Sequence, residues 1–319
     1  MGNLHAPLPE GFISLPVVDF SCSRDEISRA IVDAGKDIGF FQVINHGVPE
    51  QVRRDMEAVC EEFFAMPAAD REAFYSDDNN KPNRFFSGST YKTGGTKFWF
   101  DCLRLSSTFP IGDSKNEWPE KPQRLREVFE RFAVLTRGMG MELLQLLSEG
   151  MGLRPDYFEG PLGGGNMTMN LNHYPPCPDP NSIGLPPHCD RNLLSLLLPS
   201  TVPGLQFSYK GSWFNVETMP NAYVVNFGLP LQVVTNGVLK SIEHKVMTNS
   251  THARRSVGVF ITPTWECLIT PAEEFLSNEN PAVYKAVTFR EFYDMHSVVK
   301  DGLSSVLTIN QKSTEETTH

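Results

Sequence analysis

From about residue 166 onward, the chain consists of short apolar or alternating segments separated by clusters of Pro, Gly, Asn and Ser. In order, these segments are MTMNLNHY, LLSLLL, LQFSY, WFNVE, AYVVNFG, SIEHKVM and SVGVFITP. Many short strands with turn signals between them are typical of a sandwich, jelly roll or barrel. The pattern therefore predicts a mainly β protein, with a double-sheet core and helices packed outside it.

The first third of the chain is mainly helical in its pattern. Ser23 and Glu26 have the spacing of a capping box, and an apolar stripe follows over residues 27–34. The segment GFFQVIN (39–45) predicts a strand, and further helices are expected over residues 52–63 and 123–149. We therefore expect a helix-rich lobe with opening strands over 1–160, the β core over 161–310, and a disordered tail over 311–319.

Composition excludes several classes of function. The formal net charge of −10 argues against a nucleic-acid-binding protein, which needs clustered Lys and Arg to neutralise phosphates. No apolar run approaches the roughly 18 residues that a membrane-spanning helix requires. The six cysteines are scattered without a CxxC pair, and no secretory signal is recognisable at the N-terminus. We expect a monomeric, cytoplasmic protein with free thiols.

The segment LPPHCD places three metal-ligand residue types in direct succession. If these residues lie on a strand or at its end, His188 and Asp190 face one side and Cys189 faces the other. His244, in the later segment SIEHKV, completes a set of two histidines and one carboxylate. Such a set leaves coordination positions open and suits non-haem Fe(II), whereas a structural zinc site takes four ligands and favours cysteine. An isolated HxD pair without His244 would be weak support for a metal site.

A possible carboxylate-binding pair follows in the segment ARRSVGVF. The i, i+2 spacing of Arg254 and Ser256 puts both side chains on one face of a strand, where an arginine fork and a hydroxyl can bind a carboxylate. Arg255 would then point the other way. A surface pair of arginines is the plainer interpretation of RR alone, but the order HxD, then His, then RxS is hard to produce by chance.

These motifs and their flanks resemble the plant-type 2-oxoglutarate- and Fe(II)-dependent dioxygenases. The resemblance covers nearly the whole chain and includes LPVVDF, GFFQVINHGVP, NHYPPCPDP, PGLQF, GSWFNV, NAYVVNFG, VTNGVLKSIEHKV, RRSVGVFITP and NPAVYK. The segments WPEKP and YPPCPDPNS, with Gly-Leu where many members have Gly-Asp, are most similar to hyoscyamine 6-hydroxylase-like members.

The resemblance implies a double-stranded β-helix (jelly-roll) core with an N-terminal helical lobe. It implies that His188, Asp190 and His244 are the catalytic iron ligands. It also implies that Arg254 and Ser256 grip the distal carboxylate of 2-oxoglutarate. Because metal binding needs neutral histidines and an ionised aspartate, we expect iron to be lost at acid pH.

Further residues take roles through the same resemblance. Tyr174 and Asn172 correspond to polar residues that help to hold the co-substrate, and Phe260 corresponds to an aromatic residue beside the substrate. Apart from the resemblance, the aromatic run that contains Phe98 and Phe100 offers candidates for lining the substrate pocket, although an aromatic run is more often core.

The implied reaction uses Fe(II), 2-oxoglutarate and O2, with ascorbate as reductant, and releases succinate and CO2. The expected substrate is a small specialised metabolite or hormone that is hydroxylated, desaturated or epoxidised. Lys92 and Lys97 favour a neutral or acidic substrate, since YKTGGTK contains no acid and Asp101 is the nearest carboxylate, although solvated surface lysines are an equally good interpretation. An iron oxidase of the same superfamily that does not use 2-oxoglutarate, a non-catalytic jelly-roll binding protein and a zinc hydrolase remain alternatives.

Overall fold

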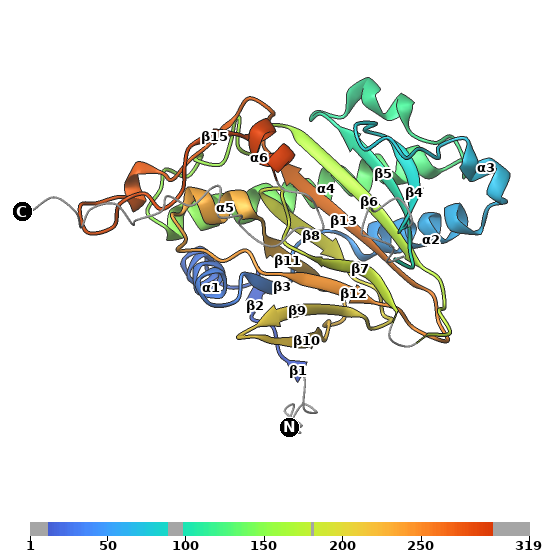
Figure 1. Cartoon of the computed structure of the whole chain (residues 1–319), viewed down its shortest axis with the longest axis horizontal. Helices are drawn as coiled ribbons and strands as arrows, with labels where there is room; N and C mark the ends of the chain where they lie inside the picture. Colours follow the sequence, from blue (N-terminus) through green and yellow to red (C-terminus); the bar gives the residue numbers. More distant parts are fainter. Residues whose placement is uncertain (1–11, 89–97, 180–181, 296–319) are drawn as a thin grey trace, which may run out of the picture.

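The computed structural model describes residues 12–88, 98–179 and 182–295, so the predicted tail at 311–319 lies outside the described residues, as do Lys92 and Lys97. Most strands belong to two sheets (Figure 1). The larger sheet runs in the order β2 (Val17–Asp19), β3 (Phe40–Ile44), β11 (Tyr223–Phe227), β8 (Leu194–Leu198), β13 (Arg254–Thr262), β6 (Asn166–Tyr174), β5 (Asp101–Ser107) and β4 (Arg84–Ser87).

The smaller sheet runs in the order β1 (Phe12–Ile13), β10 (Ser212–Val216), β9 (Leu205–Tyr209), β12 (His244–Met247) and β7 (Ile183–His188). A third sheet pairs β14 (Leu268–Ile269) with β15 (Val287–Thr288). The helices are α1 (Arg24–Asp37), α2 (Glu50–Ala65), α3 (Ala68–Glu72), α4 (Leu125–Gly150), α5 (Leu229–Val234) and α6 (Phe289–Met295), with 3-10 turns at Gly112–Glu117 and Glu273–Phe275.

Strand alternation divides the larger sheet into two chemically different faces. On β13, Val257, Val259 and Ile261 belong to the apolar cluster that also contains the buried residues of α1, α2 and α4. The alternate residues Arg254, Ser256, Gly258 and Phe260 line a cavity on the other face. Because successive side chains of a strand point to opposite faces, one strand can pack against helices and still present polar groups to an interior site.

The N-terminal helices cover the outer face of the larger sheet, and α4 lies behind that sheet in Figure 1. The predicted capping box is confirmed, since the Ser23 side chain accepts from the amide of Glu26 and the Glu26 carboxylate accepts from the amide of Ser23. This cap holds the first turn of α1 and satisfies amides that have no partner within the helix. The helices predicted over 52–63 and 123–149 correspond to α2 and α4.

The short strands β1, β14 and β15 were not predicted, and neither were two longer strand regions. The strands β4 and β5 lie within the part of the chain that the pattern made mainly helical, yet they extend the larger sheet beyond β6. The strand β7 contains Pro186 and Pro187, which have no amide hydrogen to donate to a ladder. The two prolines are tolerated because β7 is the edge strand of the smaller sheet.

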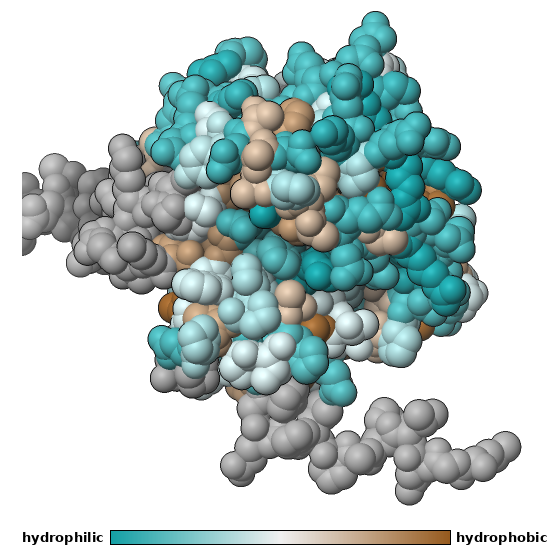
Figure 2. All heavy atoms as spheres, turned by 90° about the vertical axis from the view of Figure 1, so that its right-hand side faces the viewer, coloured by the Kyte–Doolittle hydropathy of each residue, from teal (hydrophilic) through white to brown (hydrophobic). Residues whose placement is uncertain are grey.

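Apolar side chains are mainly internal. The face of the molecule shown in Figure 2 is mostly hydrophilic, with apolar residues in small separate groups. Within residues 12–88, 98–179 and 182–295, no helix has both the length and the apolar character that crossing a bilayer requires.

Candidate active site

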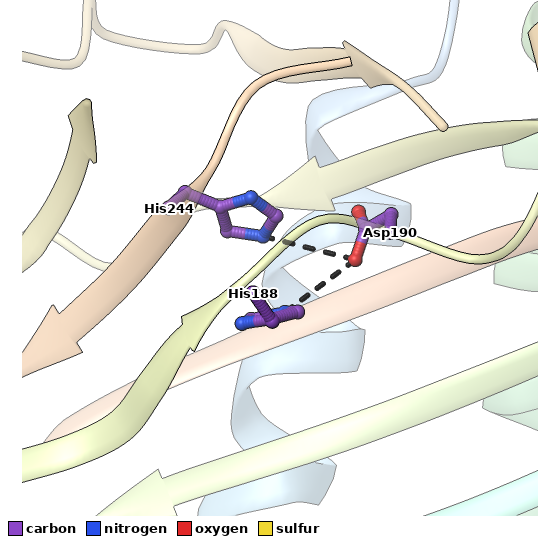
Figure 3. A group of neighbouring side chains, drawn as sticks. All are labelled: His188, Asp190 and His244. Carbon is purple, nitrogen blue, oxygen red and sulfur yellow. Dashed lines mark ion pairs between the residues drawn. The ribbon is translucent and has the colours of Figure 1, made fainter. Parts of the chain in front are cut away.

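Strand pairing brings the three predicted metal ligands together. His188 ends β7 and His244 begins β12, and the two residues are direct partners in the antiparallel ladder. Asp190 follows two residues after the end of β7, and its Oδ1 lies 3.5 Å from Nε2 of His188 and 3.7 Å from Nε2 of His244 (Figure 3). The three ligand atoms lie within 4.8 Å of one another, close enough to share one metal ion.

Backbone carbonyls orient both histidine rings. Nδ1 of His188 lies 2.8 Å from the carbonyl oxygen of Pro186, and Nδ1 of His244 lies 3.3 Å from that of Ile242. A carbonyl only accepts, so each Nδ1 carries the proton and each Nε2 offers its lone pair to the centre. This outer support is what metal-binding histidines ordinarily require.

The Asp190 carboxylate is supported in the same way. Its Oδ2 accepts a hydrogen bond from Asn226 Nδ2 at 2.7 Å and another from the Ser195 hydroxyl, which leaves Oδ1 directed at the histidines. Ser195 on β8 and Asn226 on β11 are direct ladder partners. The sequence analysis missed both residues, although each is a single polar residue inside an otherwise apolar strand, in LLSLLL and YVVNF.

The charge state of the site suits a divalent metal. Burial lowers the pKa of His244 to about 4, so this imidazole is neutral at pH 7. Burial pushes the pKa of Asp190 upward, but the two histidines and the Ser195 hydroxyl outweigh it and leave that pKa below its ordinary value. Two imidazoles and one carboxylate match the donor set that non-haem Fe(II) prefers.

Cys189 takes no part in this cluster. Its thiol faces the carbonyl oxygen of Ser241 at 3.9 Å, and burial raises its pKa to about 12. A thiol with this pKa is protonated at neutral pH and is a poor metal ligand. The arrangement therefore differs from a closed zinc site that includes cysteine.

A buried arginine lies on the face of the larger sheet that lines the cavity. Arg254 is only 3% exposed and donates from Nη1 to Ser256 Oγ at 3.2 Å, while its buried Nε has no hydrogen-bond partner among the described residues. On β6, Tyr174 is the ladder partner of Arg254 and Asn172 is that of Ser256. A buried guanidinium is costly without an anion, so this pair fits a bound carboxylate.

Two neighbours fit this interpretation. Arg255 faces the opposite side of β13, as expected, where it pairs with Glu61 at 3.2 Å. Gly204, at φ +149°, leaves room for the arginine, because a Cβ there would lie 2.6 Å from the Met247 carbonyl oxygen and 3.2 Å from Arg254 Cδ. The sequence analysis did not single out Gly204, although it is part of the segment PGLQF.

One cavity of about 690 Å³ contains both groups of residues. Its lining includes the three metal-ligand residues, the buried Arg254 and Ser256, and the predicted Tyr174, Asn172, Phe100 and Phe260. Phe98 and Phe100 belong to the same apolar cluster, but Phe98 is not among the described residues that line the cavity.

The remaining carboxylate considered for the substrate, Asp101, does not belong to the cavity lining. It is the ladder partner of His173, whereas its strand neighbour Cys102 lines the cavity. Because adjacent strand residues face opposite sides, Asp101 points away from the substrate space.

A jelly roll that places two histidines and a carboxylate beside a buried arginine defines a non-haem iron oxygenase that uses a 2-oxo acid. Comparison with known proteins agrees. Residues 165–263 match the 2OG-Fe(II) oxygenase superfamily, and residues 15–123 match the N-terminal region described as non-haem dioxygenase in morphine synthesis. The chain belongs to the 2-oxoglutarate- and Fe(II)-dependent oxygenase superfamily.

Several relatives are similar over nearly their whole length. The chain is 58% identical to 2'-deoxymugineic-acid 2'-dioxygenase of Hordeum vulgare over 97% of this chain and 92% of the relative. It is 49% identical to mugineic-acid 3-dioxygenase of the same plant, over 93% of this chain and 89% of the relative. The crystal structure of JOX2 with 2OG, Fe and JA superimposes with a TM-score of 0.81 at 30% identity, over 92% of this chain and 90% of that one.

These comparisons confirm the predicted family, fold class and reaction. The expected similarity to hyoscyamine 6-dioxygenase of Hyoscyamus niger is present at 36% identity, over 88% of this chain and 85% of the relative. The chain is an Fe(II)- and 2-oxoglutarate-dependent dioxygenase that oxidises a small specialised metabolite. The alternatives of a binding protein without catalysis and of a zinc hydrolase are set aside.

Proposed function

We propose that this enzyme hydroxylates an acidic metabolite of the mugineic-acid class. The observation that carries the proposal is the 58% identity, over 97% of this chain, to an enzyme named for 2'-deoxymugineic acid. The second relative is also named for an acid of this class. Substrate choice is thus inferred from similarity, and the charge of the cavity provides independent support.

The lining of the cavity is rich in cations. Beyond the co-substrate arginine, Lys81, Arg104, Arg191 and Arg290 contribute to it. Besides Asp190, its acidic lining residues in the described part of the chain are Glu117 and Asp294. A cleft with this excess of positive charge attracts anions and disfavours a cationic amine. An acidic substrate therefore fits better than an alkaloid.

We assign the iron to His188, Asp190 and His244, and the distal carboxylate of 2-oxoglutarate to Arg254 and Ser256. Bound Fe(II) supplies the activation of O2 that oxidises an unactivated C–H bond. The protein's share is to hold His244 neutral, to keep Asp190 ionised, and to place 2-oxoglutarate and the acidic substrate within one cavity.

Neighbouring groups complete the proposed assignment. We assign Tyr174 and Asn172 to co-substrate binding, because each is the ladder partner of a residue of the carboxylate-binding pair. Phe100 and Phe260 line the substrate side of the same cavity. The division into residues 1–160 and 161–310 also remains a proposal.

We further propose that the enzyme acts as a cytoplasmic monomer without nucleic acid. The net charge of −10 supports the last point, and the described structure contains free cysteines only. Free thiols are usual in a reducing compartment.

The test is direct. Purified enzyme with Fe(II), 2-oxoglutarate and ascorbate would be offered 2'-deoxymugineic acid, mugineic acid and, as a cationic comparison, hyoscyamine. We expect one of the two acids to gain one oxygen atom in mass spectrometry, with succinate formed, and hyoscyamine to remain unchanged. Oxidation of hyoscyamine alone would contradict the proposed substrate class.

A further inference from the structure

The cavity contains a second group of arginines on the side away from the co-substrate pair. We propose that Arg104 and Arg191 form a carboxylate-binding subsite that holds an acid group of the substrate and so determines specificity. This inference rests on the proposed function, because it names the groups that recognise an acidic substrate. The subsite is built from β5, from the loop after β7, and from α6.

Arg104 is placed by the ladder of the larger sheet. It lies on β5 with its side chain in the cavity, where its Nε donates to Asn170 Oδ1 at 3.2 Å. Its direct partner on β4 is Arg84, which donates to the Ser76 carbonyl and to Asn79 Oδ1. Like charges directly opposite each other destabilise a strand pair. An anion bound beside them lowers that repulsion, so the pair favours an acidic ligand.

Arg191 approaches the same region from the other side of the cavity. It directly follows the ligand Asp190, and its Nη1 donates to the carbonyl oxygen of Tyr293 at 3.2 Å. Its guanidinium carbon lies 3.8 Å from the centre of the Tyr293 ring. These two contacts hold α6 against the loop that follows β7.

The phenol oxygen of Tyr293 marks where an anion is favoured. Arg104 donates a hydrogen bond to the Tyr293 side chain. Burial raises the pKa of this phenol, but the positive charges of Arg191, Arg104 and Arg84 outweigh burial and leave the pKa lowered. The same charges would stabilise a carboxylate more strongly than a neutral phenol, since hydrogen bonds to ionised acceptors are the stronger ones.

This subsite is separate from the co-substrate pair. Ladder partners across β13, β6 and β5 form rows, with Ser256, Asn172 and Cys102 in one row and Gly258, Asn170 and Arg104 in the next. The rows are two residues apart, which is about 7 Å along a strand. Arg104 also lies two strands from β13, about 10 Å across the sheet. The two arginine groups therefore serve different carboxylates of a ternary complex.

The substrate arm of the test compares KM values. With wild-type enzyme, Fe(II) and 2-oxoglutarate, 2'-deoxymugineic acid would be compared with its carboxamide derivatives, each with one acid group replaced. In Arg104→Leu we expect KM for the acid to rise about 10-fold or more, as loss of a charge-assisted hydrogen bond implies. The KM of Arg104→Lys should lie between that of the wild type and that of Arg104→Leu. Arg154→Leu, which removes an exposed arginine outside the cavity lining, is the matched control.

The proposal also requires that one of the carboxamides be a poor substrate for the wild type. The KM for that carboxamide should not change in Arg104→Leu. A merely structural role for Arg104 would raise KM for every derivative and for 2-oxoglutarate alike. If wild type oxidises the acid and Arg104→Leu changes its KM less than twofold, the subsite is wrong and the proposed function stands.

A second arm decides the subsite if wild type accepts no acid of this class, in which case the proposed function fails. The enzyme loaded with Zn(II) as a redox-inactive substitute and with 2-oxoglutarate would be titrated with acetate and with acetamide. In NMR spectra, the Nε–H signal of Arg104 is identified as the one that is missing in Arg104→Lys. This signal should shift with acetate and not with acetamide. Equal shifts, or no shift with either, would overturn the subsite.

Discussion

The two ends of the cavity are built differently. At the metal end, each ligand is fixed by a hydrogen bond from the fold itself, as the Pro186 carbonyl fixes His188 and Asn226 fixes Asp190. At the substrate end, Arg104 and Arg191 meet at Tyr293, a residue of the short C-terminal helix α6. The metal end is preorganised for one ion, whereas the substrate end presents charge that a ligand can share.

The contrast shows how one scaffold can keep a reaction and vary a substrate. The metal end uses β7 and β12 of the smaller sheet together with β8 and β11, which are internal strands of the larger sheet. The substrate end uses the outer strands β4 and β5 of the larger sheet, together with α6. Replacements there can alter recognition without moving the metal ligands.

The largest expected effect is the loss of a metal ligand. His244→Ala should abolish stoichiometric iron binding and lower turnover by more than about 1,000-fold, beyond the 10–100-fold typical of an outer-shell change. The measurements are metal analysis after dialysis and succinate production. His252→Ala is the control, since His252 is exposed and contacts Thr251 in a loop. Equal iron content in the two variants would contradict the assignment.

The next effect separates the co-substrate pair from the metal. Arg254→Leu should raise KM for 2-oxoglutarate about 100-fold, because a buried bidentate partner of a carboxylate is lost. Its neighbour Arg255, which faces Glu61 on the outside of β13, provides the control Arg255→Leu. Steady-state kinetics in 2-oxoglutarate would show a change of less than threefold in the control. A similar rise in both variants would show that the effect is structural.

A smaller effect tests the preorganisation of the metal end. Ser195→Ala removes one of the two hydrogen bonds to Asp190 Oδ2 and keeps the one from Asn226. The Kd for Fe(II) should rise about 10-fold, the lower end of the range for outer-shell partners. Ser212→Ala, at an exposed position of β10, is the control for anaerobic titration. An unchanged Kd would mean that the serine does not orient the carboxylate.

The smallest effect is on stability in the metal-free protein. The pKa of His244 is about 4 in the fold and about 6.5 in an unfolded chain. Between these values the unfolded chain binds the proton first, so the free energy of unfolding falls as pH drops from about 6.5 to 4. One such group contributes about 1 kcal/mol per pH unit. The same protonation opposes iron binding.

Urea unfolding at several pH values measures this slope. His244→Gln should reduce the slope, and His252→Gln should leave it unchanged. An identical slope in wild type and His244→Gln would show that His244 is not the group that titrates.

Much of the metal end was predictable because its signals are local. The i, i+2 spacing of HxD and RxS fixes which side chains share a face. The order of the motifs along the chain identified His244 as the third metal ligand. Ser195 and Asn226 carry a readable signal as well, since a polar residue on an apolar strand needs a buried partner. Their partner could not be named from the sequence, because it depends on which strands pair.

The substrate end was not predictable for the same reason. The sequence does not show that β5 lies beside β6, so Arg104 had no assigned neighbours, and the pattern had made that region mainly helical. Tyr293 meets two arginines that are distant in sequence only because α6 returns to the cavity. The aromatic candidates Phe98 and Phe100 pack in the same apolar cluster, and the structure is needed to show that Phe100 is the one of the two that lines the cavity.

The most direct test of the central claim is the stoichiometry of the reaction. Purified enzyme with Fe(II), ascorbate and O2 would be supplied with the proposed acidic substrate, with and without 2-oxoglutarate, and succinate and oxidised product would be counted together. We predict one succinate for each oxidised product, and no product when 2-oxoglutarate is omitted. Product formation without 2-oxoglutarate would contradict the assignment of the buried Arg254 and Ser256 to a co-substrate carboxylate.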